Sequence, residues 1–226
     1  MSFRTKKIDG NKHSYRKPEF YNIWRLMFFF LVTHVFYMVR FKFVYRLKVY
    51  GQENIPQNNH FIIAANHLST LDPPLVSSIM DRGVAYMAKK ELFENPFMCW
   101  WLNWLGAFAV DREKLGVSTI KTVMSLKKTN WVLGIFPQGK REPAGAITHV
   151  TKGFASLAKS TKCDILPVGI VGTQEVKRIP FTGNIVVKIG KVIPCSDDVE
   201  SMVKEWESSI SELTGFKIIQ NQESVE

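Results

Sequence analysis

The residues best suited to chemistry in this sequence are His67 and Asp72, which follow an apolar run at 61–65. A carboxylate bonded to one imidazole nitrogen fixes the tautomer and makes the other nitrogen more basic, as a general base requires. On one continuous helix, five residues apart, the two side chains would lie roughly 140° apart. The pair can therefore meet only if a turn intervenes. The structural alternative is that Asp72, directly before Pro73, caps a helix.

A second set of candidate residues, at 136–141, ends another apolar run. Arg141 can fork onto a phosphate, Lys140 adds positive charge, and Gly139 allows close approach of the backbone. Arg112 follows a third apolar run, and it can either join this set or form a surface salt bridge with a neighbouring acid. These donors predict a site for a phosphate group.

Two other motif-like stretches do not support an alternative chemistry. Residues 134–140 have the glycine and lysine spacing of a nucleotide P-loop. However, Arg141 replaces the magnesium-binding Ser or Thr, and Pro137 removes a backbone donor. Ser156 and Lys159 match an S-x-x-K pattern but lie inside an ordinary helical stretch without companion motifs. A covalent acyl-enzyme is therefore poorly supported.

The elements that must position these residues are predicted from alternating apolar and amphipathic stretches after residue 50. We expect strands at 61–65, 84–88, 107–110, 131–136, 165–171 and 185–189. We expect helices at 73–80, 95–106, 116–128, 153–162 and 197–213. This alternation is typical of an α/β fold with a largely parallel sheet flanked by helices. In such sheets, sites form where strands end, which is where all the candidate residues fall.

The charge of the chain is concentrated at one end. The 226 residues carry a net charge of +10, of which residues 1–50 contribute +9 through 11 Lys/Arg and 2 Asp/Glu. Residues 51–226 carry 19 and 18, which excludes a globally basic nucleic-acid-binding body. A segment that is basic, aromatic and aliphatic indicates an anionic membrane surface as partner. Three scattered cysteines predict neither a disulfide framework nor a zinc site.

The N-terminal segment is expected to form a part of its own, with a basic tail and a membrane-associated helix over 1–47 and an α/β domain over 48–226. Its uncharged core, 26–39, lies between Arg25 and Arg40. Fourteen helical residues cover roughly 21 Å, less than a ~30 Å hydrocarbon core. We therefore expect a helix within one leaflet on the cytoplasmic face. A single span is the first alternative, and a buried core helix, which the +9 charge disfavours, is the second. Residues 1–19 are expected to be loose.

Taken together, the motifs resemble those of the lysophosphatidic acid acyltransferase (1-acyl-glycerol-3-phosphate O-acyltransferase) family within the glycerolipid acyltransferases. The chain has NHLSTLD at 66–72, GAFAVDR at 106–112, FPQGKR at 136–141 and LPV at 166–168. The resemblance implies that His67 is the general base and Asp72 orients it. It also implies a substrate-binding set: Asn66, Arg112, Phe136, Pro137, Gln138, Gly139, Lys140 and Arg141.

By the same resemblance, the protein is expected to be a membrane-associated acyltransferase. It would move a fatty acyl group from acyl-CoA or acyl carrier protein to a lysophospholipid hydroxyl, with 1-acylglycerol-3-phosphate as acceptor and no metal or cofactor. Gln138 and Lys140 stand where the family has Glu and Thr, which makes the predicted acceptor pocket about two charges more positive. A different lysolipid acceptor, or a lysolipid-binding protein without activity, are the alternatives.

Overall fold

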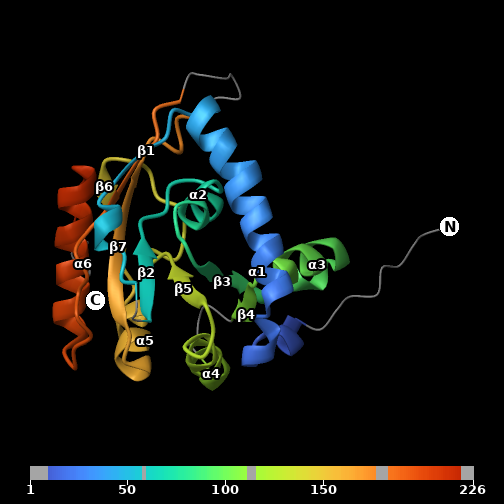
Figure 1. Cartoon of the computed structure of the whole chain (residues 1–226). Helices are drawn as coiled ribbons and strands as arrows, with labels where there is room; N and C mark the ends of the chain where they lie inside the picture. The colour runs from blue at the N-terminus through green and yellow to red at the C-terminus, as the bar shows by residue number, and fades with distance from the viewer. Residues whose placement is uncertain (1–9, 58–59, 111–115, 177–182, 220–226) are drawn as a thin grey trace.

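The structure is a computed structural model and describes residues 10–57, 60–110, 116–176 and 183–219. Its centre is a seven-stranded sheet with the order β1-β8-β7-β2-β5-β3-β4 (Figure 1). The strands are β1 (Lys48–Tyr50), β2 (Phe61–Ala65), β3 (Gly83–Lys89), β4 (Phe108–Val110), β5 (Trp131–Ile135), β7 (Asp164–Val171) and β8 (Val186–Ile189). Every neighbouring pair is parallel except β7 and β8. The expected fold class is therefore confirmed.

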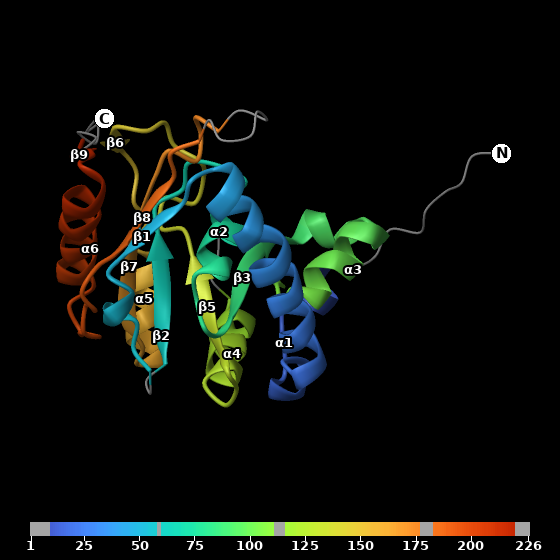
Figure 2. The ribbon, with the colours of Figure 1, turned by 45° about the horizontal axis from the view of Figure 1, so that its top comes forward.

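Helices cover the sheet, with α4, α5 and α6 packed together on one side and α2 with the N-terminal helix on the other (Figure 2). The helices are α1 (Ile23–Phe30), α2 (Asp72–Ser78), α3 (Pro96–Trp104), α4 (Val117–Leu126), α5 (Gly153–Thr161) and α6 (Val199–Thr214). Short helical turns lie at Gly10–His13, Pro18–Phe20, Gln52–Asn54 and Lys90–Glu94, and a second small sheet pairs β6 (Ala146–Ile147) with β9 (Lys217–Ile218).

The strand order creates a switch point beside β2. After β2 the chain crosses through α2 to β3 on one side of the sheet, and after β5 it crosses through α5 to β7 on the other side of β2. The two helices leave toward opposite faces, so the loops that follow β2 and β5 are free to form a crevice at the carboxyl ends of these strands. Both of the main candidate stretches lie in these loops.

The N-terminal helix is longer than its uncharged core predicts. It runs from Ile23 to Val44, 22 residues, with α1 continuing into wider turns over Leu31–Tyr37 and Arg40–Val44. It is long and apolar enough to cross a membrane by length and composition alone. One face joins the main core through Phe29 and Phe41. The helix therefore packs against the α/β body. The division of the chain into two parts at residue 47 stays a prediction.

Residues 10–19 are not loose, in contrast to the prediction for 1–19, whose first nine residues lie outside the described part of the chain. Arg16 is buried, its backbone N–H donates to Thr122 Oγ1 of α4, and its guanidinium donates to Asn103 Oδ1 of α3. The guanidinium also lies 4.2 Å from the centre of the Phe20 ring. Burial lowers the pKa of Arg16 to about 10, so it still carries its charge at neutral pH. Partners from distant helices fix a segment that looks like a solvated basic tail in the sequence.

Candidate active site

The first element of the site is the end of β2. All five residues of this strand are buried, as the apolar run at 61–65 predicts. Directly after it, Asn66 Nδ2 donates to the carbonyl of Ile170 at 2.9 Å, and Asn66 Oδ1 accepts from the N–H of Ile170 at 2.6 Å. This side chain extends the pairing of β2 with β7 beyond the strand. Asn66 is buried and turned into the sheet, so its predicted contact with substrate stays a prediction.

Asp72 holds the turn between β2 and α2 together. It is fully buried, and its Oδ2 accepts from His67 Nδ1 at 2.8 Å and from the backbone N–H groups of Leu68 and Ser69 at 2.6 and 2.7 Å. Its Oδ1 accepts from the hydroxyl of Thr173 at 2.7 Å. Asp72 is the first residue of α2 but makes no cap bond to that helix. The structural alternative of a helix cap is therefore wrong, and the expected turn brings the two side chains together.

His67 presents one free nitrogen at the mouth of this turn. Because the Asp72 carboxylate can only accept, Nδ1 is the donor of this bond, and in the neutral imidazole Nε2 carries the lone pair. Within the described residues Nε2 has no hydrogen-bond partner, and the side chain is 18% exposed. The imidazole stacks on the Phe136 ring with 4.2 Å between centroids and 24° between planes. A ring held on one edge and one face, with its other edge open, suits proton abstraction from a hydroxyl.

Gln138 supports His67 from the neighbouring loop. It is 2% exposed, and its Oε1 accepts the backbone N–H of His67 at 2.8 Å. The backbone carbonyl of His67 in turn accepts from the N–H of Glu142 at 2.8 Å. The loop after β5 therefore clamps both backbone groups of the histidine. Since glutamine and glutamate both offer an oxygen acceptor here, the departure from the family pattern preserves this contact.

The exposed part of the same loop carries the predicted anion-binding residues. Gly139, Lys140 and Arg141 are exposed, and Gly139 has φ +68°, a left-handed conformation that favours glycine. Lys140 Nζ lies 3.3 Å from Glu142 Oε1, which offsets the added positive charge. Lys140 is therefore paired with an acid, and Gln138 is turned away from solvent toward the backbone of His67.

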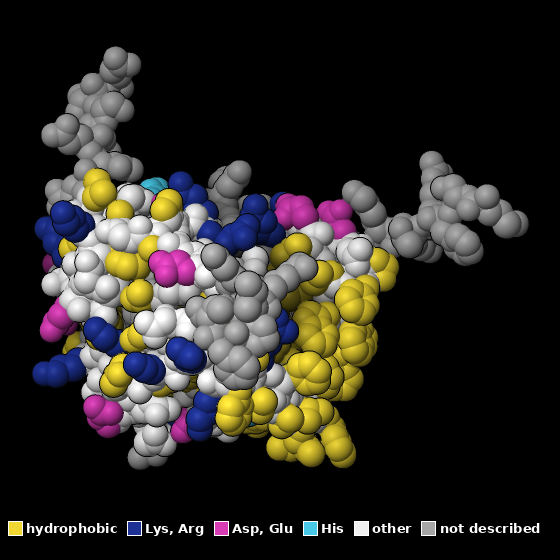
Figure 3. All heavy atoms as spheres, turned by 90° about the horizontal axis from the view of Figure 1, so that it is seen from above, with side chains coloured by type: hydrophobic (Ala, Val, Ile, Leu, Met, Phe, Trp, Pro, Cys, Tyr) yellow, Lys and Arg dark blue, Asp and Glu magenta, His cyan; other side chains and the backbone are white. Residues whose placement is uncertain are grey.

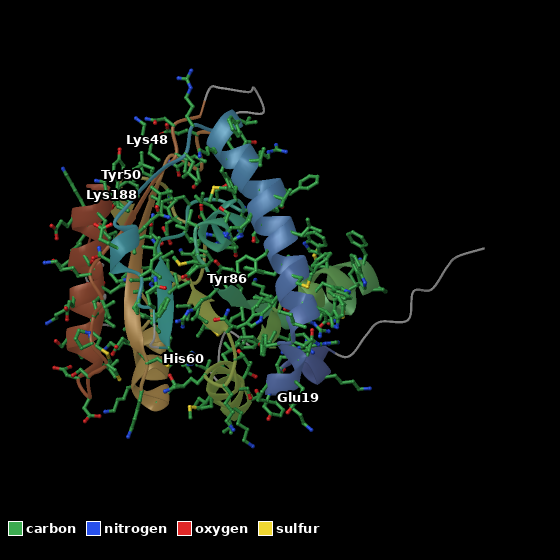
Figure 4. The ribbon with its side chains drawn as sticks, in the orientation of Figure 1. Glu19, Lys48, Tyr50, His60, Tyr86 and Lys188 are labelled. Atoms are coloured by element: carbon green, nitrogen blue, oxygen red, sulfur yellow. The ribbon has the colours of Figure 1, made fainter. Side chains whose placement is uncertain are left out.

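Tyr86 of β3, labelled in Figure 4, contacts the same Phe136 ring as His67. Its ring stacks on Phe136 at 5.7 Å, and its hydroxyl donates to the carbonyl of Pro73 at 3.1 Å. Burial raises the pKa of Tyr86 well above its ordinary value, and Asp72 adds a smaller shift in the same direction, against a hydrogen bond with Ser77. The phenol therefore stays protonated and serves as a donor to the start of α2.

The structure brings together most of the predicted set. His67, Asp72, Phe136 and Gln138 meet at the ends of β2 and β5, and Gly139 to Arg141 follow on the same loop. Pro137 is buried, and its carbonyl accepts from the hydroxyl and the backbone N–H of Thr151. Arg112 lies outside the described residues. Sequence reasoning missed Thr173, which has no motif of its own and lies 101 residues from its partner.

The fold and the site together indicate the class of protein, which is an α/β enzyme with a histidine–carboxylate pair at the switch point of its sheet. The family model for acyltransferases matches residues 46–171, which is more than half of the chain. The chain belongs to this family and is an O-acyltransferase.

Particular relatives are similar over most of the chain. A 1-acyl-sn-glycerol-3-phosphate acyltransferase of Bacillus subtilis (strain 168) is 32% identical over 173 residues, which cover 76% of this chain and 86% of the relative. One from Streptococcus pneumoniae is 33% identical, with 66% of this chain and 56% of the relative covered. The crystal structure of the 1-acyl-sn-glycerophosphate (LPA) acyltransferase PlsC from Thermotoga maritima superposes with a TM-score of 0.59 at 26% identity, over 74% of this chain and 71% of that one.

Proposed function

We propose that this enzyme transfers a fatty acyl group from a thioester donor, acyl-CoA or acyl carrier protein, to the free hydroxyl of 1-acyl-sn-glycerol-3-phosphate and so forms phosphatidic acid. The observation that carries the proposal is the 2.8 Å contact between His67 Nδ1 and the buried Asp72 carboxylate. The relatives named above act on this acceptor, which supports the choice of substrate.

In the proposed reaction, His67 Nε2 removes the proton from the acceptor hydroxyl as its oxygen attacks the carbonyl carbon of the thioester. The carbon–oxygen bond forms, the carbon–sulfur bond breaks, and the thiolate takes the proton back from the imidazolium. Asp72 stabilises the imidazolium between these two steps. The acyl chain moves directly from donor to acceptor, without a covalent enzyme intermediate, a metal or a cofactor.

The phosphate of the acceptor is assigned to the exposed end of the loop after β5. Arg141 is exposed there and offers a planar fork of donors, which matches a phosphate. The open side of Gly139, where an added Cβ would meet nothing within 4 Å, lets the phosphate approach the backbone. Arg112 is expected to contribute a second guanidinium.

A membrane surface is the proposed location of the reaction. On the N-terminal helix, exposed apolar side chains recur every fourth residue: Ile23, Met27, Leu31, Val35, Val39 and Phe43. A four-residue step overshoots an α turn and falls short of a π turn, so the change to wider turns at Leu31 keeps this row aligned. Phe36 on the same helix is 78% exposed, and Phe97 and Trp100 of α3 extend the surface.

Figure 3 shows hydrophobic side chains gathered on one side of the molecule, which agrees with this membrane face. An exposed apolar surface of this kind is costly in water and favourable in the acyl region of a leaflet. The basic residues Arg40 and Lys42 lie in the last turns of the helix, and Arg46 and Lys48 follow it, so that all four can meet anionic head groups.

The test is an acyl-acceptor panel. The purified 226-residue chain is incubated with labelled acyl-CoA, or with labelled acyl carrier protein, and with lysolipids that differ in head group. The proposal predicts labelled phosphatidic acid from 1-acyl-sn-glycerol-3-phosphate at the highest rate. If another lysolipid is acylated faster, that lysolipid becomes the proposed acceptor. If none of the donor–acceptor pairs gives a product, the proposed function is contradicted.

A further inference from the structure

We propose that Thr173 is a positioning residue of this acyl transfer, whose hydroxyl holds the Asp72 carboxylate in the orientation that His67 requires. The proposal rests on the proposed function of the His67–Asp72 pair. Thr173 follows β7 and is 2% exposed, and its Oγ1 lies 2.7 Å from Asp72 Oδ1.

The contact is fixed by the surrounding backbone. Gly172 has φ +87°, and a Cβ there would lie 2.3 Å from the carbonyl oxygen of Asn184, so only glycine fits this tight turn. The turn places the side chain of the next residue, Thr173, in the interior. Two residues before Gly172, Ile170 is bound through both backbone groups by Asn66. These two bonds fix the distance between the loop after β2 and the loop after β7.

The two carboxylate oxygens of Asp72 accept hydrogen bonds from different donors. Oδ2 already accepts three N–H groups, including that of His67, whereas Oδ1 accepts from Thr173 and from no other residue that the structure describes. The terminal torsion of an aspartate is broad, so donors on one oxygen alone do not fix the plane of the carboxylate. Without the hydroxyl, the buried Oδ1 would turn toward the backbone N–H groups of the turn. The bond to His67 would then lengthen.

The experiment compares Thr173→Val, which keeps the shape and removes the hydroxyl, with Thr173→Ser, which keeps the hydroxyl. Thr161→Val is the matched control, because Thr161 is a buried threonine of α5. Among the described residues, its hydroxyl bonds only to backbone carbonyls of its own helix. Initial rates with labelled acyl-CoA and 1-acyl-sn-glycerol-3-phosphate give kcat and KM, and thermal melts monitor folding.

Thr173→Val should lower kcat by about 10- to 100-fold, because it removes the hydroxyl that orients the Asp72 carboxylate for His67. The KM for the acceptor should change by less than about threefold. Thr173→Ser should keep kcat within about threefold of the wild type. If Thr173→Val does not fold, the serine variant decides alone: full activity supports the proposal, since a packing role of the lost methyl group would lower it.

A kcat for Thr173→Val equal to that of Thr161→Val would overturn the proposal, and so would a loss of kcat shared by Thr173→Ser. His67→Ala is measured in the same series. If His67→Ala keeps its activity, the proposed function itself fails. If it loses activity while Thr173→Val does not, only the role of Thr173 fails.

Discussion

Replacing Asp72 by asparagine separates the charge of the proposed dyad from its hydrogen bonds. An amide oxygen in the place of Oδ2 still accepts from His67, Leu68 and Ser69. The amide NH₂ in the place of Oδ1 can donate to Thr173, because a hydroxyl can also accept. The turn therefore keeps all of its contacts, whereas the imidazolium loses its negative partner.

The expected magnitudes differ sharply between asparagine and alanine at this position. Asp72→Asn should lower kcat by about 10³–10⁴-fold, with the free energy of unfolding changed by less than about 1.5 kcal/mol. Asp72→Ala leaves the buried N–H of Leu68 and the hydroxyl of Thr173 without their acceptor. At about 1–3 kcal/mol for each group this costs about 2–6 kcal/mol, which lowers Tm by roughly 5–20 °C in a chain of this size.

The assay follows labelled phosphatidic acid from labelled acyl-CoA, with Tm measured on the same preparations. Two results would refute the reasoning. Activity of Asp72→Asn within about tenfold of the wild type would show that the negative charge is not needed. A Tm for Asp72→Asn as low as that of Asp72→Ala would show that the four hydrogen bonds do not hold the turn.

Three further predictions concern other parts of the molecule. Gln138→Leu should lower Tm by about 3–9 °C by leaving the His67 N–H without an acceptor, whereas Gln138→Glu, and Gln174→Leu at an exposed position, should change it little. Phe36→Glu should weaken binding to anionic vesicles about tenfold or more, and equal binding of Phe36→Glu and the control Ile218→Glu would contradict the membrane face. Burial, with Arg82 and Lys127, lowers the pKa of His60 (Figure 4), so the unfolded chain takes up its proton at higher pH and stability falls as the pH drops below about 6.5. His60→Gln should therefore reduce the fall in Tm between about pH 7 and pH 5, and an unchanged fall would contradict this assignment.

The sheet and its helices could be predicted because their residues are buried in regular patterns. The apolar run at 61–65 becomes β2 with the same bounds, and the other strands and helices predicted after residue 50 occur within about two residues of their expected ends. The short edge strand β1 and the pair β6 and β9 were missed. Their residues are mostly exposed, so they lack the apolar run that marks a buried strand.

The ends of the N-terminal helix could not be predicted from its charges. Arg25 and Arg40 mark the limits of the apolar core in the sequence, yet both lie within the helix. Arg25 donates to the carbonyls of Asn103 and Phe20, and Arg40 donates to the hydroxyl of Tyr45. The partner in α3 lies 78 residues away, and no local pattern reveals that it satisfies an arginine inside an apolar helix.

The meeting of His67 and Asp72 could be predicted from the sequence, but the side chains that hold the pair in place could not. Residue types and the five-residue spacing at a strand end predict the meeting of His67 and Asp72. The side chains that hold it come from loops 71 and 101 residues away, at Gln138 and Thr173. The motif suggested that Gln138 faces the substrate, whereas the structure turns it toward the histidine backbone. Such long-range contacts depend on strand order, which the sequence alone does not specify.

The central claim is that His67 is the base of the acyl transfer, and His67→Ala tests it most directly. The control is His149→Ala, which removes an exposed histidine outside the site. Both variants are assayed with labelled acyl-CoA and 1-acyl-sn-glycerol-3-phosphate after their melts are shown to match the wild type. We expect His67→Ala to lose about 10²–10⁴-fold or more in rate while His149→Ala keeps its activity. Equal rates of phosphatidic acid formation by the two variants would contradict it.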